Sequence, residues 1–101
     1  MIYVMATIMV QPGEQDQFLS HAKPFIAASR EEKGCLAYDM HVSATAPTKI
    51  VSVEHYESEA AMVAHNTSAH LRALVAAVGS LLAAPPQILA ITPQEAEMIS
   101  L

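Results

Sequence analysis

The residues with the clearest capacity for chemistry lie between positions 54 and 70 of this 101-residue chain. Three of the five histidines fall there, together with a glutamate and a tyrosine: His55, His65, His70, Glu54 and Tyr56. Imidazole has an ordinary pKa close to neutral pH, so it can take up and release protons during catalysis. A nearby carboxylate can act as a base or orient a histidine. The stretch therefore indicates either a proton-transfer site or unrelated histidines on a short amphipathic segment.

Spacing along the chain argues against a metal site at these histidines. Two ligands on one helix need to be three or four residues apart, as in the H-x-x-x-H pattern. His65 and His70 are five apart, with the expected helix cap Ser68 between them, and Cys35 is the only cysteine. We therefore expect no bound metal. The chain also lacks a glycine-rich phosphate loop, since it has only three glycines.

Composition excludes several classes of partner. Hydrophobic residues make up 52% of the chain and charged residues 15%, which is typical of a globular domain. The formal net charge of −5 has the wrong sign for a phosphate backbone, so we expect no nucleic acid partner. The apolar run at residues 1–10 is shorter than the roughly 20 residues of a membrane span, so we expect no membrane association. A single cysteine and the lack of a basic leader favour a cytoplasmic location for the protein.

The order of elements predicts an α+β fold with a ferredoxin-like βαββαβ antiparallel sheet. The predicted strands are residues 2–10, 35–42, 49–56 and 87–92. The predicted helices are residues 14–32, bent at Pro24, then a short helix capped by Ser58 and a further one capped by Ser68 and ended near Gly79. Right-handed crossovers place both helical layers on one face of the sheet. Residues 1–92 form the domain, and 93–101 form a tail that could contact a partner subunit.

Apolar residues on both faces of the predicted sheet indicate a homodimer. In the first strand Val4 and Ile8 point to one face, while Tyr3 and Met5 point to the other. Helices cover one face, so the second is free to pack on another copy of the chain. Burial of that face would contribute roughly 25 cal/mol of stabilisation per Å² of apolar area removed from water. His55 lies on this second face and is expected at the dimer interface. The alternative is ordinary Val and Ile usage in the strands of a monomer.

Three segments, in this order, resemble the antibiotic biosynthesis monooxygenase family. They are EEKGCLAYDMH (31–41), VEHYESEAAMVAH (53–65) and TSAHLRAL (67–74), and the likeness runs from about residue 2 to residue 92. The resemblance implies ferredoxin-like units paired into a dimeric α/β barrel. It also implies a pocket between the sheet and its helices and, in the quinone-forming members, no metal or organic cofactor. Tyr56 stands where the family commonly has tryptophan, and this chain has no tryptophan, which argues against the haem-degrading members.

The resemblance and the strand and helix patterns together give a candidate site. The expected catalytic residues are His65, His70, Glu54 and Tyr56, and the expected substrate-binding residues are Ser52, Met62, His41 and Arg72. Five of these residues have a purely structural alternative. His65 could be a hydrogen-bonded core histidine, Glu54 half of an ion pair, Tyr56 a core ring, and His70 a solvated residue in the first turn of its helix. His41 could pair with Asp39 or simply lie near the hairpin end.

Three functions fit these residues. The first is a cofactor-independent monooxygenase that oxidises a small phenol or quinol to a quinone with O2. The second is an isomerase that moves a proton next to a carbonyl, of the dione or enediol type, which some members of the resembled family perform. The third is a catalytically silent dimer that binds a small hydrophobic ligand. Oxygen consumption distinguishes the first from the other two.

Overall fold

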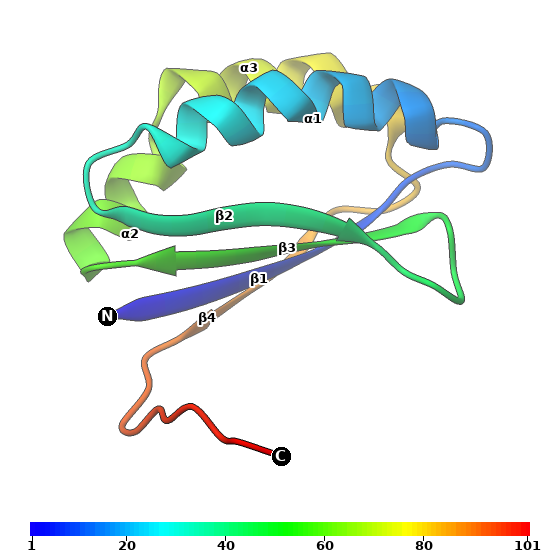
Figure 1. Ribbon diagram of the computed structural model, residues 1–101. Coiled ribbons are helices and arrows are strands. Elements are labelled where there is room, and N and C mark those ends of the chain that lie inside the picture. The colour runs from blue at the N-terminus through cyan, green and yellow to red at the C-terminus, as the bar shows by residue number, and fades with distance from the viewer.

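The computed structural model describes residues 1–101 as a four-stranded antiparallel sheet with helices on one face (Figure 1). The strands are β1 (Ile2–Met9), β2 (Cys35–Val42), β3 (Lys49–Tyr56) and β4 (Gln87–Ile91). The helices are α1 (Gln15–Arg30), α2 (Glu59–Asn66), α3 (Ala69–Val78) and a 3₁₀ turn, η1 (Gly79–Leu81). The strand order across the sheet is β2-β3-β1-β4. The predicted α+β class, ferredoxin-like topology and single helical face are therefore confirmed.

Serine side chains begin both helices of the second crossover, as the sequence predicts. The Ser58 hydroxyl accepts a hydrogen bond from the Ala61 amide at 3.1 Å, and the Ser68 hydroxyl accepts one from the Leu71 amide at 3.2 Å. Each bond satisfies one of the amides that lack a partner in the first turn of a helix. The two caps split the crossover into α2 and α3, and this break places His65 and His70 on different helices.

The core lies between the helices and the face of the sheet that they cover. Alternate residues of β1 and β3 point into it, because successive side chains of a strand lie on opposite faces. The main cluster of buried side chains comprises Ile8, Val10, Phe18, Ala22, Phe25, Tyr38, Ile50, Leu74, Val78 and Leu81. On β3 the same face also carries Ser52, Glu54 and Tyr56, all buried. The core thus contains a polar island at one end of β3.

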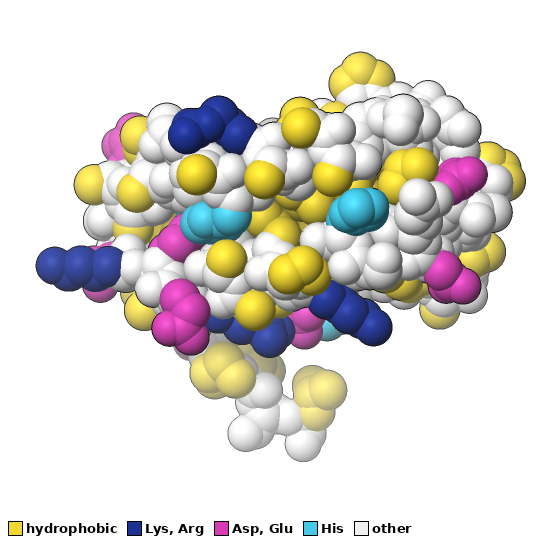
Figure 2. All heavy atoms as spheres, turned by 90° about the horizontal axis from the view of Figure 1, so that it is seen from above, with side chains coloured by type: hydrophobic (Ala, Val, Ile, Leu, Met, Phe, Trp, Pro, Cys, Tyr) yellow, Lys and Arg dark blue, Asp and Glu magenta, His cyan; other side chains and the backbone are white.

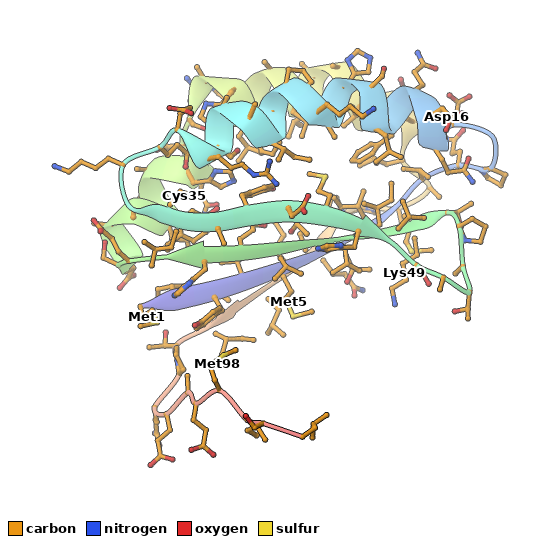
Figure 3. All side chains as sticks on the ribbon, viewed as in Figure 1. Met1, Met5, Asp16, Cys35, Lys49 and Met98 are labelled. Carbon is orange, nitrogen blue, oxygen red and sulfur yellow. The ribbon has the colours of Figure 1, made fainter.

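The other face of the sheet remains open and partly apolar. Met5 projects from it away from the helices (Figure 3), and 42% of Met5, 44% of Val53 and 58% of Leu89 is exposed. Tyr3 stacks on His55 there, with ring centroids 4.0 Å apart. The prediction that both faces carry apolar residues is confirmed, as is the placement of His55 opposite Glu54.

The tail that follows β4 leaves the sheet on the side away from the helices (Figure 1). Its apolar residues Met98 and Ile99 are exposed. None of the helices combines the length and the apolar character needed to cross a membrane.

Candidate active site

A cavity of about 240 Å³ lies between the sheet and the helices α1 and α3. Of its 18 lining residues, 13 are hydrophobic, so the chamber favours an apolar ligand. The lining residues are Val4, Ala6, Ile8, Phe18, Phe25, Tyr38, Met40, Glu54, His65, Asn66, Leu71, Leu74, Val75, Val78, Gly79, Leu82, Pro86 and Ile88. Its ionisable groups are Glu54, His65 and the Tyr38 phenol.

His65 holds a fixed orientation at this polar end of the cavity. Its ring is 3% exposed and packs near Phe25 and Tyr38, with ring centroids 5.6 Å and 5.3 Å away. Its Nδ1 lies 3.1 Å and 3.0 Å from the two carboxylate oxygens of Glu32. A carboxylate accepts hydrogen bonds, so Nδ1 carries the proton of the neutral ring and donates a hydrogen bond to Glu32. In the neutral ring the Nε2 lone pair is then free to accept a proton.

Glu54 is a buried carboxylate whose two oxygens are both occupied. Ser52 Oγ donates to Glu54 Oε2 at 2.6 Å, and Tyr56 Oη donates to Glu54 Oε1 at 2.6 Å. Ser52 Oγ also accepts from the Ala6 amide at 3.0 Å, which anchors the group to β1. His65 Nε2 is 3.9 Å from Glu54 Oε1. His65 therefore lies between two carboxylates, and a positive charge that forms on its ring is stabilised from both sides.

The two tyrosines beside Glu54 keep their protons. Burial raises the pKa of Tyr38 well above its ordinary range, and the negative charge of Glu54 raises it further. Burial also raises the pKa of Tyr56, and its hydrogen bond to Glu54 adds to the effect. Both phenols therefore act as hydrogen-bond donors at neutral pH and not as bases.

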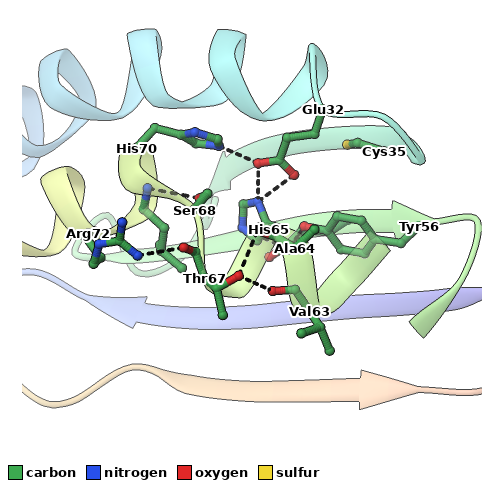
Figure 4. Close-up of polar contacts among 12 residues, drawn as sticks. Glu32, Cys35, Tyr56, Val63, Ala64, His65, Thr67, Ser68, His70 and Arg72 are labelled. Carbon is green, nitrogen blue, oxygen red and sulfur yellow. Dashed lines mark hydrogen bonds and ion pairs between the residues drawn. The ribbon is translucent and has the colours of Figure 1, made fainter. Parts of the chain in front are cut away.

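The loop between α1 and β2 brings Glu32 to the site. Gly34 has a φ of +87°, a left-handed conformation that glycine adopts without strain. A Cβ at this position would lie 2.7 Å from the Ala61 Cβ, so the loop packs directly on α2. Glu32 then contacts His65 on α2 and His70 on α3 (Figure 4). One carboxylate thus connects three segments of the chain.

The structure brings together five of the eight candidate residues. Ser52 and Tyr56 are hydrogen-bonded to Glu54, and His65 Nε2 lies 3.9 Å from the same carboxylate. His70 is connected to His65 through Glu32. Of these five, only His65 and Glu54 line the cavity. Tyr56 and Ser52 act by holding Glu54.

The other three candidates lie apart from the cavity. His41 is exposed on the open face of the sheet, opposite Val51 in the β2–β3 register, because the residues that alternate with Tyr38 and Met40 point away from the helices. Arg72 is exposed, and its Nη1 donates to the Thr67 carbonyl at 2.6 Å. Met62 packs against a small separate cluster beside Tyr56. None of the three is in a position to contact a ligand in this cavity.

The sequence interpretation missed Glu32, Phe25, Tyr38 and Asn66. Glu32 and Tyr38 lie in the first family-like segment, EEKGCLAYDMH, so the signal for them was present. In the sequence, Phe25 is one of several apolar residues at helical spacing, and nothing marks it as a cavity residue. Asn66 ends α2 directly after His65 and lines the cavity.

Comparisons with known proteins agree on one relationship. Residues 1–77 match the model of a family described as "Antibiotic biosynthesis monooxygenase". The chain is 38% identical over 85 residues to "Putative monooxygenase YcnE" of Bacillus subtilis (strain 168). This alignment covers 84% of this chain and 90% of that protein. It is 29% identical to the solved structure of Rv0793 from Mycobacterium tuberculosis, with a TM-score of 0.88, covering 96% of this chain and 98% of that one. A Deinococcus radiodurans structure shares the fold, with a TM-score of 0.91 over 99% of both chains at 22% identity.

The class of protein follows from this agreement between fold, site and relatives. This is a small ferredoxin-like enzyme of the monooxygenase type, and it has an apolar cavity between its sheet and its helices. The chain belongs to the antibiotic biosynthesis monooxygenase family.

Proposed function

We propose that this enzyme oxidises a small phenol or quinol to a quinone with O2 and uses no cofactor. The observation that supports the proposal best is the state of His65. Its Nδ1 is bound to Glu32, and the residue lines the cavity, so Nε2 is the ring nitrogen left to act as a general base. The surrounding chamber is apolar, so a proton transferred there is protected from water.

The reaction begins with removal of the phenolic proton. His65 Nε2 takes the proton, and the imidazolium is stabilised by Glu32 at Nδ1 and by Glu54 near Nε2. The substrate is left as a phenolate, which is far more easily oxidised than the neutral phenol. This step requires only binding, orientation and a positioned base.

The remaining steps balance without a further redox partner. The phenolate gives one electron to O2, which yields a phenoxyl radical and superoxide. These combine through a C–O bond to give a peroxide on the ring. His65 returns its proton to the outer oxygen, the O–O bond breaks, and the ring C–H proton passes to the departing hydroxide to form water. The products are the quinone and one water, which together contain both atoms of O2 and both hydrogens removed from the substrate.

The size and charge of the cavity narrow the substrate class. A protein cavity of about 150 Å³ accommodates benzene, so 240 Å³ suits an aromatic compound of one or two rings. No lysine or arginine lines the cavity. A phosphorylated substrate, as some isomerases use, would therefore lack a counter-charge, and we favour an uncharged phenol or quinol.

We further propose that two copies of the chain pack through the open face of the sheet. The exposed residues Met5, Val53 and Leu89 form an apolar surface there. His55 Nε2 is buried on this face with no hydrogen-bond partner, which leaves a polar atom available to a second copy. The tail at 93–101, with exposed Met98, is available to contact the same partner.

The test is oxygen uptake during a screen of one- and two-ring quinols and diones. We expect equimolar consumption of O2 and quinol, and loss of most of this activity in His65→Ala, because a general base contributes about 10²- to 10⁴-fold. His21→Ala is the matched control, since His21 is exposed on α1 outside the main cavity.

Other outcomes distinguish the two rival functions. Conversion of a dione without oxygen uptake would overturn the monooxygenase proposal in favour of an isomerase. Binding of the quinols with no turnover, unchanged in His65→Ala, would indicate a silent binding protein.

A further inference from the structure

Three side chains of types that can bind a metal meet at the Nδ1 edge of the His65 ring, and two of them do not line the main cavity. They are Glu32 after α1, His65 on α2 and His70 on α3 (Figure 4). One ligand atom from each of these residues lies within 4.8 Å of the other two. Glu32 Oε2 contacts both His65 Nδ1 and His70 Nε2. The two histidines alone have the wrong spacing for a metal site on one helix. In the folded chain they lie on different helices, and the loop after α1 supplies a carboxylate between them.

The charge of this region favours a cation. Glu32 and Glu54 are 14% and 5% exposed at their side chains, and their only ion-pair partners are His65 and His70. No lysine or arginine lies within ion-pair distance of either carboxylate. When both imidazoles are neutral, two negative charges therefore remain in a mostly buried place, where an uncompensated charge is costly.

We propose that Glu32, His65 and His70 bind one divalent transition-metal ion of the Zn²⁺ class. Two imidazole nitrogens and a carboxylate form a donor set that Zn²⁺ takes in proteins. Tetrahedral bonds of about 2.0–2.1 Å place neighbouring ligand atoms about 3.3 Å apart. The 3.0 Å between Glu32 Oε2 and His65 Nδ1 needs only a small adjustment to reach this separation, whereas the closer Glu32–His70 contact must lengthen more.

The site also has a route for entry. His70 borders a second, shallow cavity together with His21 and Pro24 of α1. Figure 2 looks down on the helical layer and shows histidine side chains on either side of a hollow that contains hydrophobic atoms. A hydrated ion can reach His70 from this side without crossing the main cavity. A water molecule is the natural fourth ligand.

Metal binding at this position has a consequence for catalysis, and this consequence rests on the proposed function. A neutral imidazole that binds a metal through Nδ1 carries its proton on Nε2. His65 could then donate a hydrogen bond into the cavity but could not accept the phenolic proton. The ion would therefore act as an inhibitor and not as a cofactor.

The test is titration of the intact, untagged protein with Zn²⁺, followed by calorimetry, and with Co²⁺, followed by its visible absorption. We expect one ion per chain and a tetrahedral Co²⁺ spectrum. Affinity should fall at least about tenfold in His70→Ala and in Glu32→Gln, since even outer-sphere changes cost about 10- to 100-fold. His41→Ala, which removes a histidine from the opposite face of the sheet, should bind the ion as the wild type does.

The outcomes separate the two proposals. Failure of the wild type to bind Zn²⁺, or equal binding in a folded His70→Ala variant, would overturn the metal site and leave the monooxygenase proposal standing. Loss of oxygen uptake at the Zn²⁺ concentration that fills the site, reversed by a chelator, supports both. Binding without inhibition would uphold the metal site and overturn the role of His65 as the base.

Discussion

Glu32→Gln tests the link between the loop after α1 and the proposed role of His65 as a base. The change keeps the shape of the side chain and removes its charge. Glutamine can still contact Nδ1, but it cannot stabilise the imidazolium as a carboxylate does. It can also turn its amide group toward the ring and favour the Nε2–H tautomer, which is not a base.

The expected magnitude follows from the contact that is lost. A hydrogen bond to a charged group contributes about 1.5–3 kcal/mol, and each 1.4 kcal/mol changes a rate about tenfold. We therefore expect kcat for quinol oxidation to fall about 10- to 150-fold. KM should change little, because Glu32 does not line the cavity.

Two measurements check this prediction. Oxygen uptake gives kcat and KM, with Glu31→Gln as the control, since Glu31 is the exposed neighbouring carboxylate. Long-range ¹H–¹⁵N NMR reports the tautomer of His65 without any substrate. The reasoning is refuted if Glu32→Gln retains the wild-type kcat, or if Glu31→Gln loses as much activity.

The remaining predictions concern stability and assembly. Burial raises the pKa of the Tyr56 phenol, so above pH 10 the unfolded chain releases this proton while the folded chain keeps it. The free energy of unfolding should therefore fall as the pH rises above 10, and Tyr56→Phe should reduce this fall by about 1.4 kcal/mol per pH unit. Gly34→Ala should lower the free energy of unfolding in urea by about 1–3 kcal/mol, because the φ of Gly34 is +87° and the added Cβ meets α2. In the control Gly79→Ala the added Cβ meets nothing within 4 Å, so the free energy of unfolding should be nearly unchanged. Val53→Asp, on the open face, should convert a dimer to monomers in sedimentation, while Val63→Asp on exposed α2 should not. A wild type that sediments as a monomer at micromolar concentration would contradict the assembly proposal.

Much of the fold was predictable because its signals are local. Alternation of apolar residues marks the faces of β1 and β3, and the serines at 58 and 68 define where two helices begin. The same alternation correctly placed Ser52, Glu54 and Tyr56 on one face. Their hydrogen bonds to each other follow from that placement, since residues two apart on a strand are neighbours on one face.

The site was only partly predictable because its central contact is not local. Glu32 lies in a loop, where no periodicity indicates a direction, and its partners come 33 and 38 residues later in the chain. The direction of His41 depends on which face of β2 the helices cover. That in turn depends on the irregularity in the β2–β3 pairing between Cys35 and Ala37, which the sequence does not reveal.

β4 lies at the edge of the sheet and forms part of the cavity wall. All five of its residues are exposed, and it pairs only with β1, yet Ile88 forms part of the cavity wall. Segments with few buried contacts open locally at the lowest free-energy cost. We therefore expect transient opening of this strand to admit aromatic molecules, so its amide hydrogens should exchange with solvent sooner than those of β1 and β3. A second copy packed over Leu89 would slow that opening, and subunit association would then govern the rate of product release.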